Sequence, residues 1–214
     1  MKPLLITLLL ILSATTGRAQ SSPEVTTLER RKGFTTSFDE NTRIISFGLG
    51  FPNLYRIRYD EPAGYTHIKT SGFGPMYAKF EFAAFRNVGL VSCFGYSTFH
   101  YSYFGVASHP TGPQQVIYYD DVNTLNLAIS ANYHFADWID NPRLDLYAGL
   151  GVGVNYLKSR YGNIPPYRSP ESRAELVPVL RAGGRYYLDP IFGLYGELGY
   201  DGLSILQLGF SVRF

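Results

Sequence analysis

The stretch RLDLYAGLGVGVNY, residues 143–156, alternates apolar side chains with polar or small ones. Its even positions hold Leu, Leu, Ala, Leu, Val, Val and Tyr, and its odd positions hold Arg, Asp, Tyr, Gly, Gly, Gly and Asn. Successive side chains of a strand point to opposite faces, so this pattern predicts a β-strand with one apolar and one polar face. The glycines at 149, 151 and 153 lie inside that strand and no helix follows them, so we interpret them as space for long side chains such as Arg181 and not as a nucleotide-binding loop.

The same alternation recurs along most of the chain after residue 41. It is clear over 123–135 and 206–214 and less regular over five further segments, about 42–51, 73–84, 88–104, 174–187 and 191–200. Short connections over 85–87, 136–142 and 188–190 alternate with long ones over 52–72, 105–121 and 159–173. Short turns at one end and long loops at the other are typical of outer-membrane barrels, whose apolar face contacts lipid. We therefore predict an all-β fold over 41–214, a closed eight-stranded antiparallel transmembrane β-barrel.

Aromatic residues gather near both ends of these segments, as expected at the two interfaces of a membrane. Near the short turns we expect a girdle of Phe82, Phe85, Tyr133, Phe135, Trp138, Tyr186, Tyr187, Phe192 and Phe214. Near the long loops we expect a second girdle of Phe51, Phe73, Tyr101, Tyr103, Tyr118, Tyr119, Tyr156 and Tyr200.

The first 40 residues differ from the rest. Lys2, an apolar run over 4–12 and a small-residue ending at Ala19 predict a signal peptide over 1–19, cleaved between Ala19 and Gln20. Residues 20–40 are polar and aperiodic, and we expect an unstructured periplasmic lead-in there. Without the 2 leader cations, the 19 Lys and Arg fall to 17 and balance the 17 Asp and Glu, which argues against nucleic-acid binding. Cys93 is the single cysteine, so no disulfide can form within the chain.

The chain ends with apolar residues at alternate positions, namely Leu208, Phe210, Val212 and the C-terminal aromatic Phe214. With the leader and the eight alternating segments, this ending resembles the small bacterial outer-membrane barrels of the OmpA-transmembrane, OmpX and OmpW type, a porin-like family. The resemblance implies a location in the outer membrane of a Gram-negative envelope. It also implies that Leu208, Phe210, Val212 and Phe214 form the signal read by the barrel-assembly machinery.

An eight-stranded barrel is just wide enough to be filled by side chains. The charged residues on the inward parity should therefore pair with one another and not line a pore, because buried charges need partners. These residues are Lys79, Glu81, Asp145, Glu175, Arg181, Arg185, Glu197 and Arg213.

His100 and Ser102 are the one pair that points to catalysis, because two residues apart on a strand share a face and a His can activate a Ser for acyl transfer. The pair is similar to the His-x-Ser pair of outer-membrane lipid A deacylases, but the sequence identifies no acid that would orient the histidine. His134 and Ser130 share the inward face, where we expect a structural role. His67 and His109 fall in different long loops with no metal-ligand spacing.

We therefore expect a non-enzymatic protein with no catalytic, cofactor or metal site. It would stabilise the envelope or present loops 52–72, 105–121 and 159–173 to an extracellular ligand, with outer-membrane lipid as its other partner. Three alternatives stay open: a lipid-modifying barrel enzyme, a narrow transporter of small apolar compounds and a soluble exported ligand-binding barrel.

Overall fold

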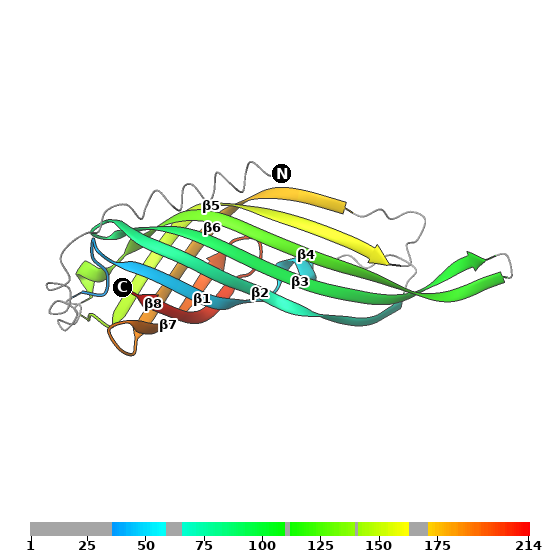
Figure 1. The fold of residues 1–214 in the computed structure, drawn as a ribbon, viewed down its shortest axis with the longest axis horizontal. Helices are drawn as coiled ribbons and strands as arrows, with labels where there is room; N and C mark the ends of the chain where they lie inside the picture. The colour runs from blue at the N-terminus through cyan, green and yellow to red at the C-terminus, as the bar shows by residue number, and fades with distance from the viewer. Residues whose placement is uncertain (1–35, 59–65, 110–111, 140, 163–170) are drawn as a thin grey trace, which may run out of the picture. The chain divides into compact units, whose positions relative to one another are not determined.

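The computed structural model describes residues 36–58, 66–109, 112–139, 141–162 and 171–214. These residues form a closed barrel of eight antiparallel strands in which each strand pairs with its sequence neighbours and β8 closes the ring on β1 (Figure 1). The strands are β1 Arg43–Phe51, β2 Thr66–Phe85, β3 Val88–His109, β4 Gly112–His134, β5 Leu144–Gly162, β6 Glu171–Tyr187, β7 Phe192–Tyr200 and β8 Leu206–Arg213. Two short helices lie between strands, α3 Leu54–Ile57 and η1 Ala136–Trp138. The predicted fold class is confirmed.

The strands on one side of the ring are longer than predicted. Pairing of β3 with β4 continues without a break to His109 and Gly112, so most of the predicted loop 105–121 is strand. Strand structure also replaces loop over 66–72, 159–162 and 171–173. Backbone hydrogen bonds hold these extensions although their apolar alternation is weaker, because ladder pairing does not require an apolar face. In Figure 1 the β3–β4 hairpin runs past the neighbouring strands at the end opposite the C-terminus, which we call the long-hairpin end.

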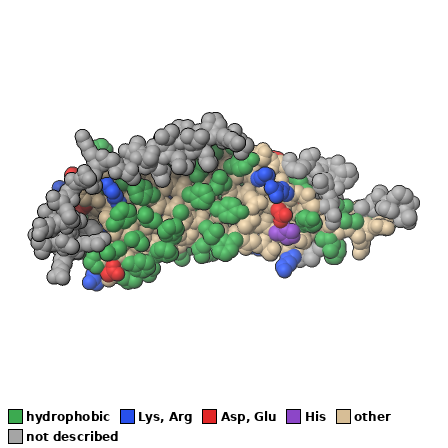
Figure 2. All heavy atoms as spheres, in the orientation of Figure 1, with side chains coloured by type: hydrophobic (Ala, Val, Ile, Leu, Met, Phe, Trp, Pro, Cys, Tyr) green, Lys and Arg blue, Asp and Glu red, His purple; other side chains and the backbone are tan. Residues whose placement is uncertain are grey.

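The two faces of the sheet have opposite chemistry. On the outward face Leu150 is 68% and Ile129 66% exposed, whereas Asn126 and Asn155 on the inward face are buried. Figure 2 shows hydrophobic side chains over the middle of one side, with basic, acidic and histidine side chains beyond them toward the long-hairpin end. Among the described residues, no helix is long and apolar enough to cross a membrane.

The girdle prediction was wrong for four tyrosines. Tyr101, Tyr103, Tyr118 and Tyr187 are buried inside the barrel, because each lies on the inward parity of its strand. Tyr119, Tyr133, Tyr156 and Tyr186 are exposed on the outward face, as expected. An aromatic residue near a strand end is therefore not enough to predict that its ring faces outward. The parity of the strand decides on which side of the sheet the ring lies.

Two segments outside the predicted strands enter the barrel. Phe38, in the predicted unstructured lead-in, is 2% exposed and stacks on His134 with ring centroids 3.5 Å apart. Between β7 and β8, Leu203 is 0% exposed, and the preceding Gly202 has a φ of 85°, which glycine adopts without a steric cost. The carboxylate of Asp201 accepts hydrogen bonds from the backbone N–H groups of Leu203 at 2.8 Å and of Ser204 at 3.0 Å. This connection is a structured plug.

The glycines of β5 make room for a neighbouring strand. A Cβ at Gly149 would lie 2.0 Å from the side-chain oxygen of Asn132, and one at Gly151 would lie 2.2 Å from the backbone oxygen of Ile129. The prediction that these glycines make room for Arg181 was wrong, because the nearest atoms belong to β4. The absence of a side chain thus lets the polar interior face of β4 approach β5.

Candidate functional site

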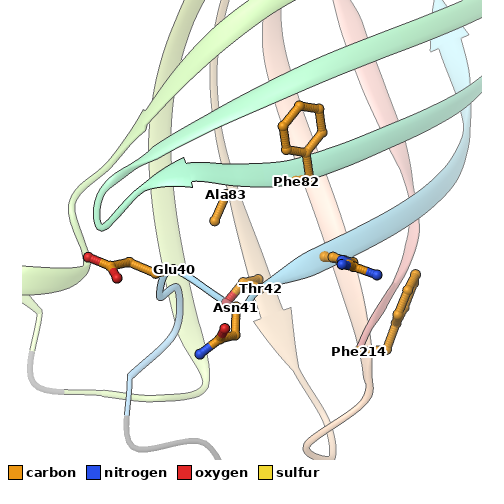
Figure 3. A pocket seen from close by; sticks show the side chains of 7 residues that line it. Glu40, Asn41, Thr42, Phe82, Ala83 and Phe214 are labelled. Carbon is orange, nitrogen blue, oxygen red and sulfur yellow. The ribbon is translucent and has the colours of Figure 1, made fainter. Parts of the chain in front are cut away.

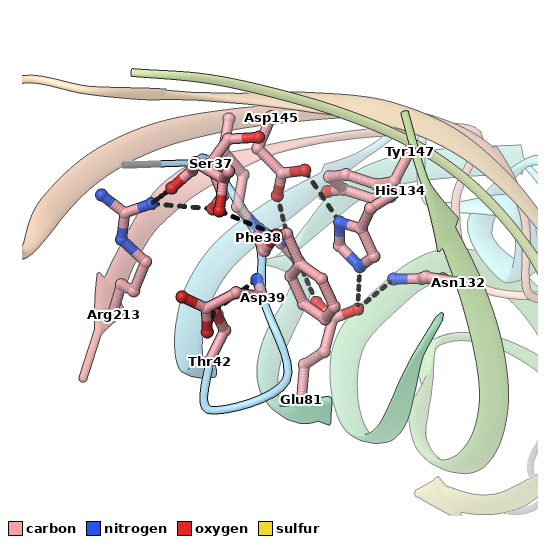
Figure 4. A network of polar contacts seen from close by, with 12 residues as sticks. Ser37, Phe38, Asp39, Thr42, Glu81, Asn132, His134, Asp145, Tyr147 and Arg213 are labelled. Atoms are coloured by element: carbon pink, nitrogen blue, oxygen red, sulfur yellow. Dashed lines mark hydrogen bonds and ion pairs between the residues drawn. The ribbon is translucent and has the colours of Figure 1, made fainter. Parts of the chain in front are cut away.

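The barrel interior near the short turns holds a network of ionisable side chains (Figure 4). His134 lies between two carboxylates, with Nδ1 2.8 Å from Asp145 and Nε2 2.9 Å from Glu81. Arg185 donates to the same two acids, at 2.9 Å to Asp145 and at closer range to Glu81. Asn132 donates a further bond to Glu81 at 2.8 Å. Each acid therefore has at least two donors, as a buried carboxylate requires.

A second network lies next to the first. Lys79 forms an ion pair with Glu197, and Arg181 approaches the same carboxylate at 3.9 Å. The hydroxyl of Tyr147 donates to the other oxygen of Glu197 at 2.6 Å. Tyr147 also stacks under the Arg185 guanidinium at 4.2 Å, so the two networks are in contact. Together they place buried, paired charges in the interior of the barrel.

The two remaining predicted interior charges lie at opposite ends of the barrel. Arg213 is buried at the short-turn end and donates to the backbone oxygens of Ser37 at 2.7 Å and Pro190 at 3.1 Å. Glu175 is half-exposed at the long-hairpin end, where it accepts from the Tyr55 hydroxyl and from Arg173, each at 2.9 Å. These two residues lie at the two ends of the barrel interior.

Tyr55 and the plug residue Leu203 close the long-hairpin end from within. Both are buried and belong to one cluster of hydrophobic side chains, and the backbone N–H of Leu54 donates to Leu203 at 2.9 Å. Below them Asn126 donates to Asn155 at 2.6 Å across the interior. A solute on the barrel axis would have to displace these layers and both ion networks.

The predicted assembly residues lie on β8 and at the C-terminus. Leu208, Phe210 and Phe214 are exposed on the outward face, and Val212 is partly covered. The backbone of Phe214 exchanges two hydrogen bonds with Arg43, at 2.9 and 3.0 Å, so the chain end is paired with the start of β1. Figure 3 shows the shallow pocket at this seam, with Phe214 on one side, Asn41 and Thr42 before β1, and Phe82 and Ala83 on β2.

A turn at the short-turn end is held by an exposed acid. Asp137, in η1, accepts from the Arg86 guanidinium at 2.8 Å and from the Asn87 side-chain amide at 2.5 Å. The Asn87 hydrogen bond, and next the positive charge of Arg86, lower the pKa of Asp137 below its usual range. This contact ties the β2–β3 turn to the β4–β5 connection.

The pair His100 and Ser102 lies on the outward face of β3. The imidazole Nε2 is 3.0 Å from Ser102 Oγ, and Nδ1 is 2.6 Å from the carboxylate of Asp121 on β4. Asp121 is the direct cross-strand partner of His100, so the two side chains share a face. The structure thus supplies the orienting acid that we could not identify in the sequence.

The reason for missing Asp121 is its place in the segment predicted as loop 105–121. Once β3 and β4 are paired through to His109 and Gly112, the register sets residue 121 opposite residue 100. The sequence held one signal, since Pro110 and Gly112 are turn-forming residues, and an antiparallel hairpin that turned there would set residue 121 opposite residue 100. In the described part of the chain, no group of three or more His, Cys, Asp or Glu side chains is placed to hold a metal ion.

Comparison with known proteins gives structural likeness at low identity. No protein-family model and no curated protein matches the chain. The N-terminal β-barrel domain of Pseudomonas aeruginosa OprF is 17% identical, with a TM-score of 0.44, 83% of this chain covered and 99% of that one. Ail of Yersinia pestis, solved in complex with the heparin analogue sucrose octasulfate, is 16% identical, with a TM-score of 0.44 and coverage of 82% and 99%. In its structure the chain is therefore similar to small eight-stranded outer-membrane barrels.

Proposed function

We propose that this chain is an integral outer-membrane protein whose barrel spans the bilayer, with its short turns in the periplasm and its long hairpins outside. The main support is that apolar side chains face outward and charged side chains face inward, which is the reverse of the pattern in a water-soluble protein. Leu127, Leu150 and Val152 are exposed on the outward face, while Glu81, Asp145 and Glu197 are buried within. Apolar surface of this extent is costly in water and stable in lipid. The same inversion counts against a soluble barrel with an apolar ligand cavity.

The proposed barrel is closed and conducts no solute. Its interior is crossed by the Lys79–Glu197 pair, by the His134 network and by the buried plug at Leu203. Opening a path would separate ion pairs in a low-dielectric interior, which is strongly unfavourable. This arrangement counts against the narrow transporter and leaves the outer surface as the place of function.

The structural role is to stabilise the envelope and to present the long hairpins to partners outside. The β3–β4 pairing is the longest in the described ring, and the strands it joins run past their neighbours at the long-hairpin end. No reaction is assigned to the interior in this role. The predicted cleavage at Ala19 and the assembly signal ending at Phe214 belong to the same proposal.

Membrane fractionation combined with a heat-modifiability gel tests the location. We expect a carbonate-resistant band in the outer-membrane fraction that migrates differently before and after boiling. A soluble protein without a heat shift would overturn the proposal. Recordings in planar bilayers test closure: we expect no steps above the protein-free baseline, and steady unitary conductance would show that the interior opens.

A further inference from the structure

Ser102, His100 and Asp121 form a hydrogen-bonded row on the outward face of the barrel. Ser102 Oγ lies 3.0 Å from His100 Nε2, and His100 Nδ1 lies 2.6 Å from the Asp121 carboxylate. All three side chains are partly exposed, so a substrate can reach the serine. The ring of Tyr119 stacks on the imidazole with centroids 5.7 Å apart and limits its rotation.

This order of atoms is that of a serine hydrolase. An acid on one imidazole nitrogen keeps the proton there and leaves the other nitrogen free to accept a proton from the serine. The acid and the base come from directly paired residues of neighbouring strands, and the base and the nucleophile are two apart on one strand. Residues on paired strands hold such geometry more firmly than loop residues do.

The depth of the row on the barrel indicates the substrate. Toward the short turns, the outward side chains are Phe94 on β3 and Leu125 and Leu127 on β4, which belong to the apolar band. Between this band and the row, the Tyr96 hydroxyl donates to Asn123 at 2.8 Å. A tyrosine with its ring toward hydrocarbon and its hydroxyl in a polar layer marks a membrane interface. In the proposed membrane orientation this polar layer puts Ser102 close to the interface, where lipid acyl esters lie, with the exposed apolar side chains of Phe104 and Val106 beyond it on the same strand.

Exposed cations flank the row on both sides. Lys69 on β2 is the cross-strand partner of Ser102, and Arg160 on β5 is the partner of Asp121. Lys158 lies one outward position below Arg160, opposite Asn123. All three are exposed, and paired residues share a face of the sheet. Cations at this depth favour a lipid with a phosphate-bearing headgroup.

We propose that Ser102, His100 and Asp121 hydrolyse an acyl ester of a phosphate-bearing membrane lipid. Ser102 Oγ attacks the ester carbonyl carbon while His100 Nε2 takes the serine proton. The bond to the lipid alcohol then breaks, and His100 returns the proton to the departing oxygen, which leaves an acyl-serine and a deacylated lipid. Water attacks the acyl carbon, His100 takes its proton and passes it to Ser102, and the fatty acid leaves. Lys69 is placed to stabilise the negative charge on the carbonyl oxygen.

This activity goes beyond the structural role proposed above and, if present, would overturn the expectation from the sequence that the protein is non-enzymatic. It depends on the proposed membrane location for its substrate but not for its chemistry. A small serine-reactive probe in detergent therefore tests the catalytic row even if the location were wrong. Two lipid sources share the required chemistry, glycerophospholipid and lipid A, and the test below separates them.

The first measurement is labelling of the folded full-length protein in detergent with a fluorophosphonate, followed by mass mapping. We expect the label on Ser102, and we expect its loss in Ser102→Ala and in His100→Ala. The matched control is Ser92→Ala, because Ser92 is also exposed on the outward face of β3 but lies within the apolar band. Absence of label from Ser102, or label that persists in His100→Ala, would overturn the proposal.

The second measurement is release of fatty acid from vesicles that contain the protein. One set is made of phosphatidylethanolamine and phosphatidylglycerol, and the other also contains lipid A, with products read by mass spectrometry. Release above the level of Ser102→Ala in the first set identifies glycerophospholipid, and release only in the second identifies lipid A. Asp121→Asn should lower the rate about 10²- to 10⁴-fold while the heat-shifted band is retained. Equal release by wild type and Ser102→Ala in both sets would contradict the assignment.

Discussion

Two histidines in this barrel each contact an acid, yet their surroundings differ in every other respect. His134 is fully buried, and both of its ring nitrogens face carboxylates, Asp145 and Glu81. His100 is partly exposed, with one nitrogen on Asp121 and the other on the hydroxyl of Ser102. Both nitrogens of the first imidazole are taken up by carboxylates, so neither is available to a hydroxyl group. The second has one nitrogen available as a base.

The difference shows that the side of the sheet decides what a histidine does. The inward residue works as a connector that neutralises buried carboxylates, and its value lies in the stability of the barrel. The outward residue adds little to stability, since exposed ion pairs contribute at most about 1 kcal/mol. Its geometry matters for the chemistry of Ser102. The following experiments separate these two roles.

Truncation of each histidine should give the largest contrast. His134→Ala leaves Glu81 and Asp145 with fewer donors in a dry interior, and we expect a loss of about 3–5 kcal/mol in the free energy of unfolding. His100→Ala should change it by about 0.5 kcal/mol or less. Urea unfolding in lipid vesicles, followed by the heat-shifted band, measures both values. Similar losses for the two variants would contradict the assignment of separate roles.

Neutralisation of each partner acid should reverse the contrast. Asp121→Asn keeps the fold and slows fluorophosphonate labelling of Ser102 about 10²-fold or more, because the imidazole loses its orienting acid. Asp145→Asn removes the negative charge that pairs with buried Arg185. We expect the free energy of unfolding to fall by about 2–4 kcal/mol, and the labelling rate of the folded fraction to stay unchanged. Parallel labelling and unfolding of both variants provides the check. A labelling defect in folded Asp145→Asn would link the two sites.

The ring on the buried histidine offers a smaller perturbation. Phe38→Leu keeps most of the apolar volume but loses the stack on His134, in which the ring planes differ by 7°. We expect a loss of about 1 kcal/mol in the free energy of unfolding. Phe94→Leu serves as a control, because that ring is 47% exposed on the outward face of β3. An equal loss in both variants would argue against a specific role for the stack.

Loss of the exposed Asp137 contact should have the smallest effect, and it shows how little an exposed acid such as Asp121 contributes to stability. Hydrogen bonding to Asn87 and the charge of Arg86 lower the pKa of Asp137 in the folded protein. The contact is therefore fully present above the ordinary carboxyl pKa and is lost as the pH falls through the lowered value. The protection of the 86–87 turn, which is its hydrogen-exchange rate relative to the intrinsic rate at the same pH, should fall only in that acidic window. The protection in Asp137→Asn should not change there, and a pH response in that variant would assign the effect to another group.

The regular part of the fold followed from alternation alone. Over 143–156 the period of two marks each residue as inward or outward, and the structure keeps Tyr147 inside and Leu150 outside. Alternation failed where both faces meet water or protein. The extensions of β3 and β4 were predicted as loop, Phe38 was placed in an unstructured lead-in, and Leu203 lay outside every predicted strand. Outside the apolar band no solvent difference across the sheet imposes a pattern, so the sequence signal disappears while the backbone pairing continues.

The sequence by itself determined the class of fold, the number of strands and the parity of the charged residues, because those depend on a local repeat. The tertiary structure decided which charges meet, since Glu81 and Arg185 or Lys79 and Glu197 are more than 100 residues apart. It also decided that His100 has an acid, because the partner is set by the register of a long hairpin and not by nearby sequence. Closure of the ring and the stagger of its strands fix these meetings, and neither is encoded in a repeat of two residues.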